Sequence, residues 1–174
     1  MKIKCNLGNI DEAIRQIEEY EKRIIKKRKI FLEKLAEIGV DVAKVKFQSA
    51  QYDGENDVVL SKPEWVNDNK LVISATGKSV MFIEFGTGVH YASESHPKAG
   101  ELGFSRGTYG YGLGKLDSWR YEGNPGTHGE VIREGKHKGE VRTHGNPANR
   151  CMYEASKEMR RKIREIAKEV FGSD

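Results

Sequence analysis

The chain has 174 residues, of which 32% are charged and 37% are apolar. This length suits one domain, but the apolar share is low for a compact globule, so part of the chain is expected to become buried only against partners. The absence of a run of ~20 apolar residues excludes a membrane-spanning helix, and the first residues do not form an apolar signal segment. We therefore expect a protein made in the cytoplasm, with Cys5 and Cys151 as unpaired thiols.

The first predicted element is a long helix over residues 10–38, continuing or restarting to about residue 50. Its apolar residues recur at steps of three and four and form one stripe: Ile10, Ile14, Ile17, Ile24, Phe31, Leu35 and Ile38. Asn9 is the predicted N-cap, and Gly39 permits an end or a kink. Glu21 and Arg28 fill the two skipped steps of the stripe, which argues against a simple two-stranded coiled coil.

A basic band lies within this helix and consists of Lys22, Arg23, Lys26, Lys27, Arg28 and Lys29. Two interpretations fit it. Nearby glutamates at helical spacing favour a solvated helix face. The alternative is a surface that meets DNA or an acidic subunit, which is consistent with the net charge of +4. No aromatic residues interleave the band, so sequence-specific recognition of bases is not expected.

A small sheet is predicted for residues 57–76. Two short β-prone runs, 58–60 and 71–73, flank the turn residues Asn67, Asp68 and Asn69 and indicate a hairpin. The segment 81–88 follows and reads Met-Phe-Ile-Glu-Phe-Gly-Thr-Gly. Glu84 stands between apolar residues, so its carboxylate must face solvent or meet a hydrogen-bond donor. Gly86 and Gly88 permit positive φ angles, and we expect a structural turn near an interface, formed by Glu84, Phe85, Gly86 and Gly88.

The segment 92–128 is rich in glycine and is predicted to be a long loop that is mobile or ordered by a partner. Four aromatic residues in it are candidate interface contacts, namely Tyr109, Tyr111, Trp119 and Tyr121. Packing of these rings on their own domain is the alternative. A polar hairpin is predicted for residues 130–142.

The last predicted element is a helix over residues 147–171, with Asn146 as N-cap and Pro147 at its first position. Its apolar face consists of Met152, Ala155, Met159, Ile163, Ile166 and Val170. The expected fold class is therefore α+β: a long N-terminal and a C-terminal helix packed on a small, mostly antiparallel sheet, with a long glycine-rich insertion.

The order of these motifs resembles the small tail-component, or neck, proteins of long-tailed bacteriophages, which help to join the head to the tail. The resemblance rests on Phe-Ile-Glu-Phe-Gly-Thr-Gly at 82–88, on Arg142-Thr143-x-Gly145-Asn146-Pro147 before the last helix, and on Met152-Tyr153-Glu154 within it. It implies a virion protein that is not an enzyme, needs no cofactor and forms a ring. The implied partners are copies of itself, neighbouring neck, connector and tail-tube proteins and packaged DNA, but no membrane.

Two other functions were weighed against this expectation. A basic nucleic-acid-binding module would use the 22–29 band. A metal-dependent nuclease would combine His128 or His144, Asn146 or Asn149, and Glu84 or Glu130. The five histidines, His90, His96, His128, His137 and His144, have irregular spacing and are expected to be surface or loop residues, so no metal site is predicted.

Overall fold

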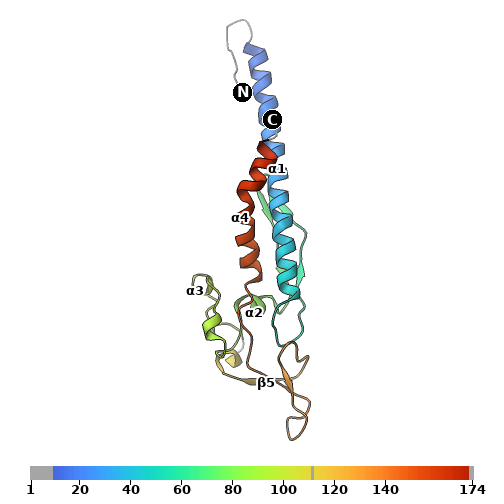
Figure 1. Cartoon of the computed structure of the whole chain (residues 1–174), viewed down its shortest axis with the longest axis vertical. Coiled ribbons are helices and arrows are strands. Elements are labelled where there is room, and N and C mark those ends of the chain that lie inside the picture. Colours follow the sequence, from blue (N-terminus) through green and yellow to red (C-terminus); the bar gives the residue numbers. More distant parts are fainter. Residues whose placement is uncertain (1–9, 111, 173–174) are drawn as a thin grey trace.

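The computed structural model describes residues 10–110 and 112–172 and has the predicted α+β architecture (Figure 1). Two long helices, α1 (Ile10–Gln48) and α4 (Cys151–Phe171), lie side by side along the long axis. The strands of residues 59–76 lie along α1, and the short helices and remaining strands gather towards one end. The helices are antiparallel, because the ring of Phe171 at the end of α4 lies 5.8 Å from that of Phe31 near the middle of α1, whereas Cys151 at the start of α4 packs in one cluster with Phe47 near the end of α1. The N-terminal half of α1 therefore extends beyond the end of α4.

Helix α1 runs without interruption through Gly39, where an end or kink had been predicted as an option. Gly39 is buried, and a Cβ atom there would lie 2.7 Å from the Sδ atom of Met159 in α4 and 2.9 Å from the Cδ1 atom of Ile73. Because that space is filled by neighbouring side chains, this glycine permits close packing of α4 rather than a helix end. Val45, near the end of the helix, is 63% exposed. Asn9, the predicted N-cap, lies outside the described residues.

The strands form three small antiparallel sheets. β1 (Val59–Leu60) pairs with β4 (Ala75–Thr76), and β2 (Glu64–Asn67) pairs with β3 (Lys70–Val72). The predicted turn at 67–69 is correct, but β1 pairs with 75–76 and not with 71–73. The reason is that four further residues of β2 lie between the first run and the turn, so they take the inner pairing.

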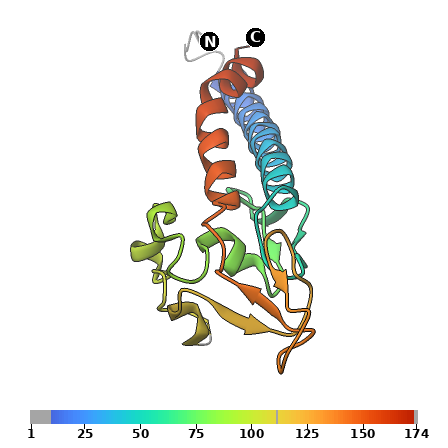
Figure 2. The ribbon, with the colours of Figure 1, turned by 60° about the horizontal axis from the view of Figure 1, so that its bottom comes forward.

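The third sheet corrects the interpretation of residues 92–128 as one irregular loop. This segment contains η1 (Ala92–Glu94), α3 (Ala99–Leu102), η2 (Gly112–Lys115) and the strand β5 (Trp119–Tyr121). β5 pairs with β7 (Val141–Thr143), which also pairs with β6 (Glu130–Val131). The predicted polar hairpin is thus two strands of a three-stranded sheet, and the central strand β7 buries Val141 and Thr143 (Figure 2).

Helix α2 (Val80–Phe85) covers most of the motif at 81–88 and is followed by Gly86 as its C-cap. The start of α4 differs from the prediction, because the helix begins at Cys151 and not at Pro147. Asn146 is not its N-cap, since the side-chain amide of Asn146 donates to the carbonyls of Phe82 and Pro147. The residue before the helix is Arg150, in the left-handed region with φ 55°.

The core lies in two clusters along the helix pair. One cluster, next to α2, contains Ala43, Phe47, Ile83, Cys151 and Ala155. The other, near the end of α4, contains Leu35, Ile166 and Val170, with Phe31, Ile38 and Met159 packed on it. The predicted stripes of both helices supply most of these residues. Ile163 is an exception and is 43% exposed.

Candidate functional site

The turn after α2 joins three parts of the fold. Gly86 has φ 78°, and its backbone lies so close to residues 146–148 that a Cβ atom would be 2.8 Å from the amide nitrogen of Ala148. The amide of Thr87 donates to the carbonyl of Asn146 at 3.0 Å, and the amide of Asn149 donates to the carbonyl of Ile83 at 2.9 Å. The turn therefore fixes α2 against the segment that connects β7 to α4.

The carboxylate of Glu84 does not face solvent; it accepts hydrogen bonds from donors inside the protein. The side chain is buried, and its two oxygens accept the backbone amides of Met152 at 2.9 Å and Tyr153 at 3.0 Å. These are amides of the first turn of α4, which lack partners within the helix and carry the positive end of the helix dipole. Glu84 thus does for α4 what an N-cap side chain would do.

A buried histidine completes the surroundings of Glu84. The Nε2 atom of His96 lies 3.2 Å from a carboxylate oxygen of Glu84, and the Nδ1 atom of His96 accepts the amide of Lys98 at 3.0 Å. Since Nδ1 accepts a hydrogen bond, the hydrogen bond to the carboxylate of Glu84 is donated by Nε2–H. Glu84 and Phe85 are each 6% exposed, so they act within the fold and not on its surface.

An open cleft of about 430 Å³ brings together both glycines of the predicted turn and three of the four aromatic candidates. Gly86 and Gly88 line it together with Tyr109, Trp119 and Tyr121. Tyr111, the fourth aromatic candidate, lies outside the described residues. Phe82 of the 82–88 motif also lines the cleft, and so does Tyr52, which no sequence pattern indicated because it lies far from the other lining aromatic residues in the chain.

The cleft is both aromatic and acidic. Asp53, Glu55 and Glu122 line it, and no lysine, arginine or histidine does so among the described residues. Burial raises the pKa of Tyr109 to about 12 and, together with the charge of Asp53, that of Tyr121 to about 12, so both phenols stay neutral. Aromatic faces next to carboxylates attract a cationic group such as a lysine or arginine side chain.

The basic band lies on the part of α1 that begins to extend beyond α4. Lys22, Arg23 and Lys26 are exposed, whereas Lys27, Arg28 and Lys29 are half-buried. Lys29 is engaged within the chain, with its Nζ atom 3.1 Å from a carboxylate oxygen of Asp68 and 5.8 Å from the ring centroid of Trp65. The band is therefore split between an exposed part and a part that packs on the β2–β3 hairpin.

The residues of the nuclease hypothesis are mostly committed to other contacts. Glu84 and Asn146 are buried in the joint described above, and the side chain of Asn149 hydrogen bonds to the backbone of Gln51. His128 and Glu130 are exposed. Only His144 of this set lies in a cluster with metal-ligand chemistry, and its neighbours there are His90 and Asp117, neither of which the hypothesis included.

Cys151 is a free, buried thiol at the start of α4. Burial, with a smaller effect from the nearby charge of Glu84, raises the pKa of its thiol to about 12. Because the thiolate is the reactive form, this cysteine is a core residue and not a nucleophile.

Comparison of the chain with protein-family models, curated proteins and solved structures gives no significant match. Among the described residues, none of the helices has the length and apolar character needed to cross a membrane.

Proposed function

We propose that this chain is a non-enzymatic structural subunit that assembles with copies of itself at the head–tail junction of a tailed bacteriophage. The motif resemblance supplies the setting. The observation that supports the assembly role is that the apolar stripe of α1 is packed within the chain along only half of the helix. In the C-terminal half, Phe31, Leu35 and Ile38 of this stripe pack with α4.

In the N-terminal half the same stripe stays exposed. Ile10, Ile14 and Ile17 are 49%, 50% and 51% exposed, and they continue the spacing of the buried half. Residues 10–27 extend roughly 27 Å at ~1.5 Å per residue, which is long enough for several turns of contact with another helix. A row of half-exposed isoleucines at this spacing is typical of a helix–helix interface.

The charges on the stripe favour a second copy as the partner. Arg28 lies at a stripe position and is half-buried, so part of its side chain remains accessible to a neighbouring copy. Glu21, one heptad earlier, is an exposed carboxylate that a neighbouring copy would offer to Arg28. The two charges that weaken a simple coiled coil would then pair between subunits.

The cleft provides a second and different contact surface. It lies among the loops and strands at the end of the molecule away from the N-terminal half of α1 (Figure 1). Closed rings repeat a contact between two different patches of each subunit, and stacked rings require further patches. The aromatic and acidic lining suits a lysine or arginine from an adjacent neck, connector or tail-tube protein.

The assembly role is tested by replacing Ile14 and Ile17 with glutamate. We expect self-association, measured by sedimentation velocity over a range of concentrations, to weaken by at least tenfold, while circular dichroism keeps the helical signal. Val131→Glu is the matched control, because Val131 is 49% exposed on β6 and not on α1. Unchanged association of the double variant, or an equal loss in the control, would refute the α1 interface.

The phage setting has a separate test. The gene is expected to lie between capsid and tail-tube genes, and its deletion is expected to give unjoined heads and tails by electron microscopy. Complementation with the chain should restore joined particles, and complementation with Ile14→Glu/Ile17→Glu should not. Joined particles in the deletion strain would remove the head–tail assignment and leave the self-association result standing.

A nucleic-acid-binding module remains the second candidate, because Lys22, Arg23 and Lys26 are exposed on the same part of α1. It requires binding to duplex DNA that weakens steeply with salt and is lost when these three residues become glutamine. DNA binding that survives these substitutions would count against it.

A further inference from the structure

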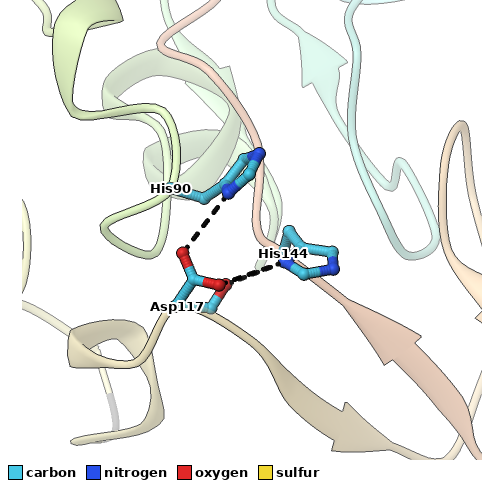
Figure 3. A group of neighbouring side chains, drawn as sticks. All are labelled: His90, Asp117 and His144. Atoms are coloured by element: carbon cyan, nitrogen blue, oxygen red, sulfur yellow. Dashed lines mark hydrogen bonds and ion pairs between the residues drawn. The ribbon is translucent and has the colours of Figure 1, made fainter.

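A second cluster of polar side chains lies beside the cleft and plays no part in the proposed assembly. It consists of His90, Asp117 and His144, which come from the segment after the Gly86–Gly88 turn, the segment before β5, and the residue after β7 (Figure 3). Figure 3 shows both imidazole rings turned towards the carboxylate of Asp117. Ligand atoms of the three side chains all lie within 4.8 Å of one another.

The individual distances show how the two rings are held. The Nδ1 atom of His90 lies 3.3 Å from the Oδ1 atom of Asp117. The Nδ1 atom of His144 lies 3.5 Å from the Oδ2 atom of Asp117 and 3.1 Å from its carbonyl oxygen. The ring centroids of the two histidines are 4.9 Å apart. Both rings thus direct the same nitrogen at one carboxylate, and neither Asp117 oxygen has an ion pair with a lysine or arginine in the described chain.

The backbone around the cluster is fixed by contacts independent of the three side chains. Trp119, two residues after Asp117, pairs with Thr143 next to His144. Thr87 forms a bridge with Asn146 on the other side of His144. A Cβ atom at Gly88, two residues before His90, would lie 3.0 Å from the carbonyl oxygen of His144. The three residues are therefore held together by the fold and do not depend on their own ion pairs.

Two imidazoles and one carboxylate are a ligand set that zinc and other divalent first-row metals accept. Bonds of about 2.0–2.1 Å from such an ion bring its ligands to roughly 3.3 Å from one another in tetrahedral geometry. The ligand atoms of the three side chains, now up to 4.8 Å apart, can reach this spacing by small rotations of the side chains. His90 and Asp117 are exposed and His144 is half-buried, so a fourth position would be open to water or to a partner's side chain.

We propose that His90, Asp117 and His144 bind one divalent transition-metal ion, with zinc as the best match to the ligand set. The bound ion joins His90, after the Gly86–Gly88 turn, to Asp117 before β5 and His144 after β7. Gly88, Trp119 and Thr143, which line the cleft, are within two residues of the ligands. Metal binding would therefore stiffen the wall of the cleft, and this role is independent of the assembly proposed for α1.

The test uses the tag-free full chain after treatment with a chelator. We expect isothermal titration with zinc chloride to show one equivalent bound, and cobalt(II) to give the visible absorption of a protein-bound ion. His144→Gln should weaken zinc binding by at least tenfold, and His90→Gln/His144→Gln should abolish it. Zinc should raise the melting temperature of the unmodified chain but not that of the double variant.

His128→Gln is the matched control, because His128 is exposed and lies outside the cluster. It should bind zinc as the unmodified chain does. The proposal fails if the unmodified chain binds no zinc or cobalt, a measurement that does not depend on the folding of any variant. It also fails if the double variant, folded by circular dichroism, binds zinc with unchanged affinity.

Discussion

At the scale of single residues, the contact between α2 and the segment that connects β7 to α4 depends on residues whose replacement would lose a buried hydrogen bond or create a steric clash. Glu84 provides both oxygens to the first amides of α4, and its burial makes an unpaired carboxylate there costly. The glycines at 86 and 145 have φ 78° and 79°, and each backbone touches the opposite segment. The sequence predicts that Glu84 and Gly86 belong to a structural turn near an interface, and within the chain this turn joins α2 to the segment before α4.

Replacing Gly86 with alanine should destabilise the protein by more than replacing Gly135. Both have positive φ, at 78° and 82°, so both alanines carry a backbone cost of about 1–3 kcal/mol. At Gly86 a Cβ atom would also lie 2.8 Å from the amide nitrogen of Ala148, whereas at Gly135 it meets nothing within 4 Å. Urea denaturation of the two variants measures the difference. Equal losses of unfolding free energy would show that the close approach at Gly86 is relaxed without cost.

At the scale of elements, the short helix α2 is held at its start by a side chain from outside it. The carboxylate of Asp57 accepts the amides of Lys78 at 2.8 Å and Ser79 at 2.9 Å, and it also accepts the Ser79 hydroxyl. These hydrogen bonds, the one from the Ser79 hydroxyl most of all, lower the pKa of Asp57 to about 2. A six-residue helix gains little from its own hydrogen bonds, so this cap helps to place Glu84.

The Asp57 cap predicts a specific dependence of stability on pH. Because its pKa is lowered in the folded state, its contribution is complete above about pH 4 and is lost as the pH falls towards 2. Asp57→Asn should therefore be less stable than the unmodified chain at pH 7, and the difference should shrink between pH 4 and 2. Urea denaturation across this range measures it, with Asp41→Asn on α1 as a control for loss of one exposed carboxylate. A difference that stays constant with pH would contradict the ionised cap.

At the scale of the whole molecule, α1 is one helix with two environments. Its C-terminal half packs with α4, and its N-terminal half extends beyond the end of α4 with isoleucines exposed. A helix gains most of its stability from packing of its apolar face. The N-terminal half of α1 thus has less packing within the chain than the C-terminal half, and we expect its order to increase on the proposed assembly.

Hydrogen exchange followed by mass spectrometry should reveal these two environments. In dilute protein, amides of residues 12–26 should exchange at least tenfold faster than those of residues 32–46, because local opening is easier where no partner helix packs. The difference should diminish at concentrations where the chain associates. The same experiment on Ile14→Glu/Ile17→Glu should show no such concentration effect. Uniform protection along α1 in dilute protein would contradict this account.

The assignment to a phage neck stays a proposal. Of the elements of the fold, the two long helices were the ones that the sequence predicted best. The spacing of Phe31, Leu35 and Ile38 and of Ala155, Ile166 and Val170 gave two amphipathic helices, because helical periodicity is local in sequence. The turn at 67–69 was predicted correctly for the same reason, although the strand β2 before it was not predicted and the pairing of 58–60 with 71–73 was wrong. The α+β class follows from these local signals.

What only the tertiary structure decided was which distant segments meet. The N-cap signal of Asn146 and Pro147 was misleading, because Phe82, Thr87 and the Glu84 carboxylate offer these segments better partners across the fold. Residues 119–121 became a strand because β7 provided the hydrogen-bonding edge that the glycine-rich segment lacks on its own. His90, Asp117 and His144 gave no spacing signal and meet only because β5, β7 and the Gly86–Gly88 turn converge. Local periodicity determined the helices, and long-range hydrogen bonding and burial determined the joint, the cleft and the histidine cluster.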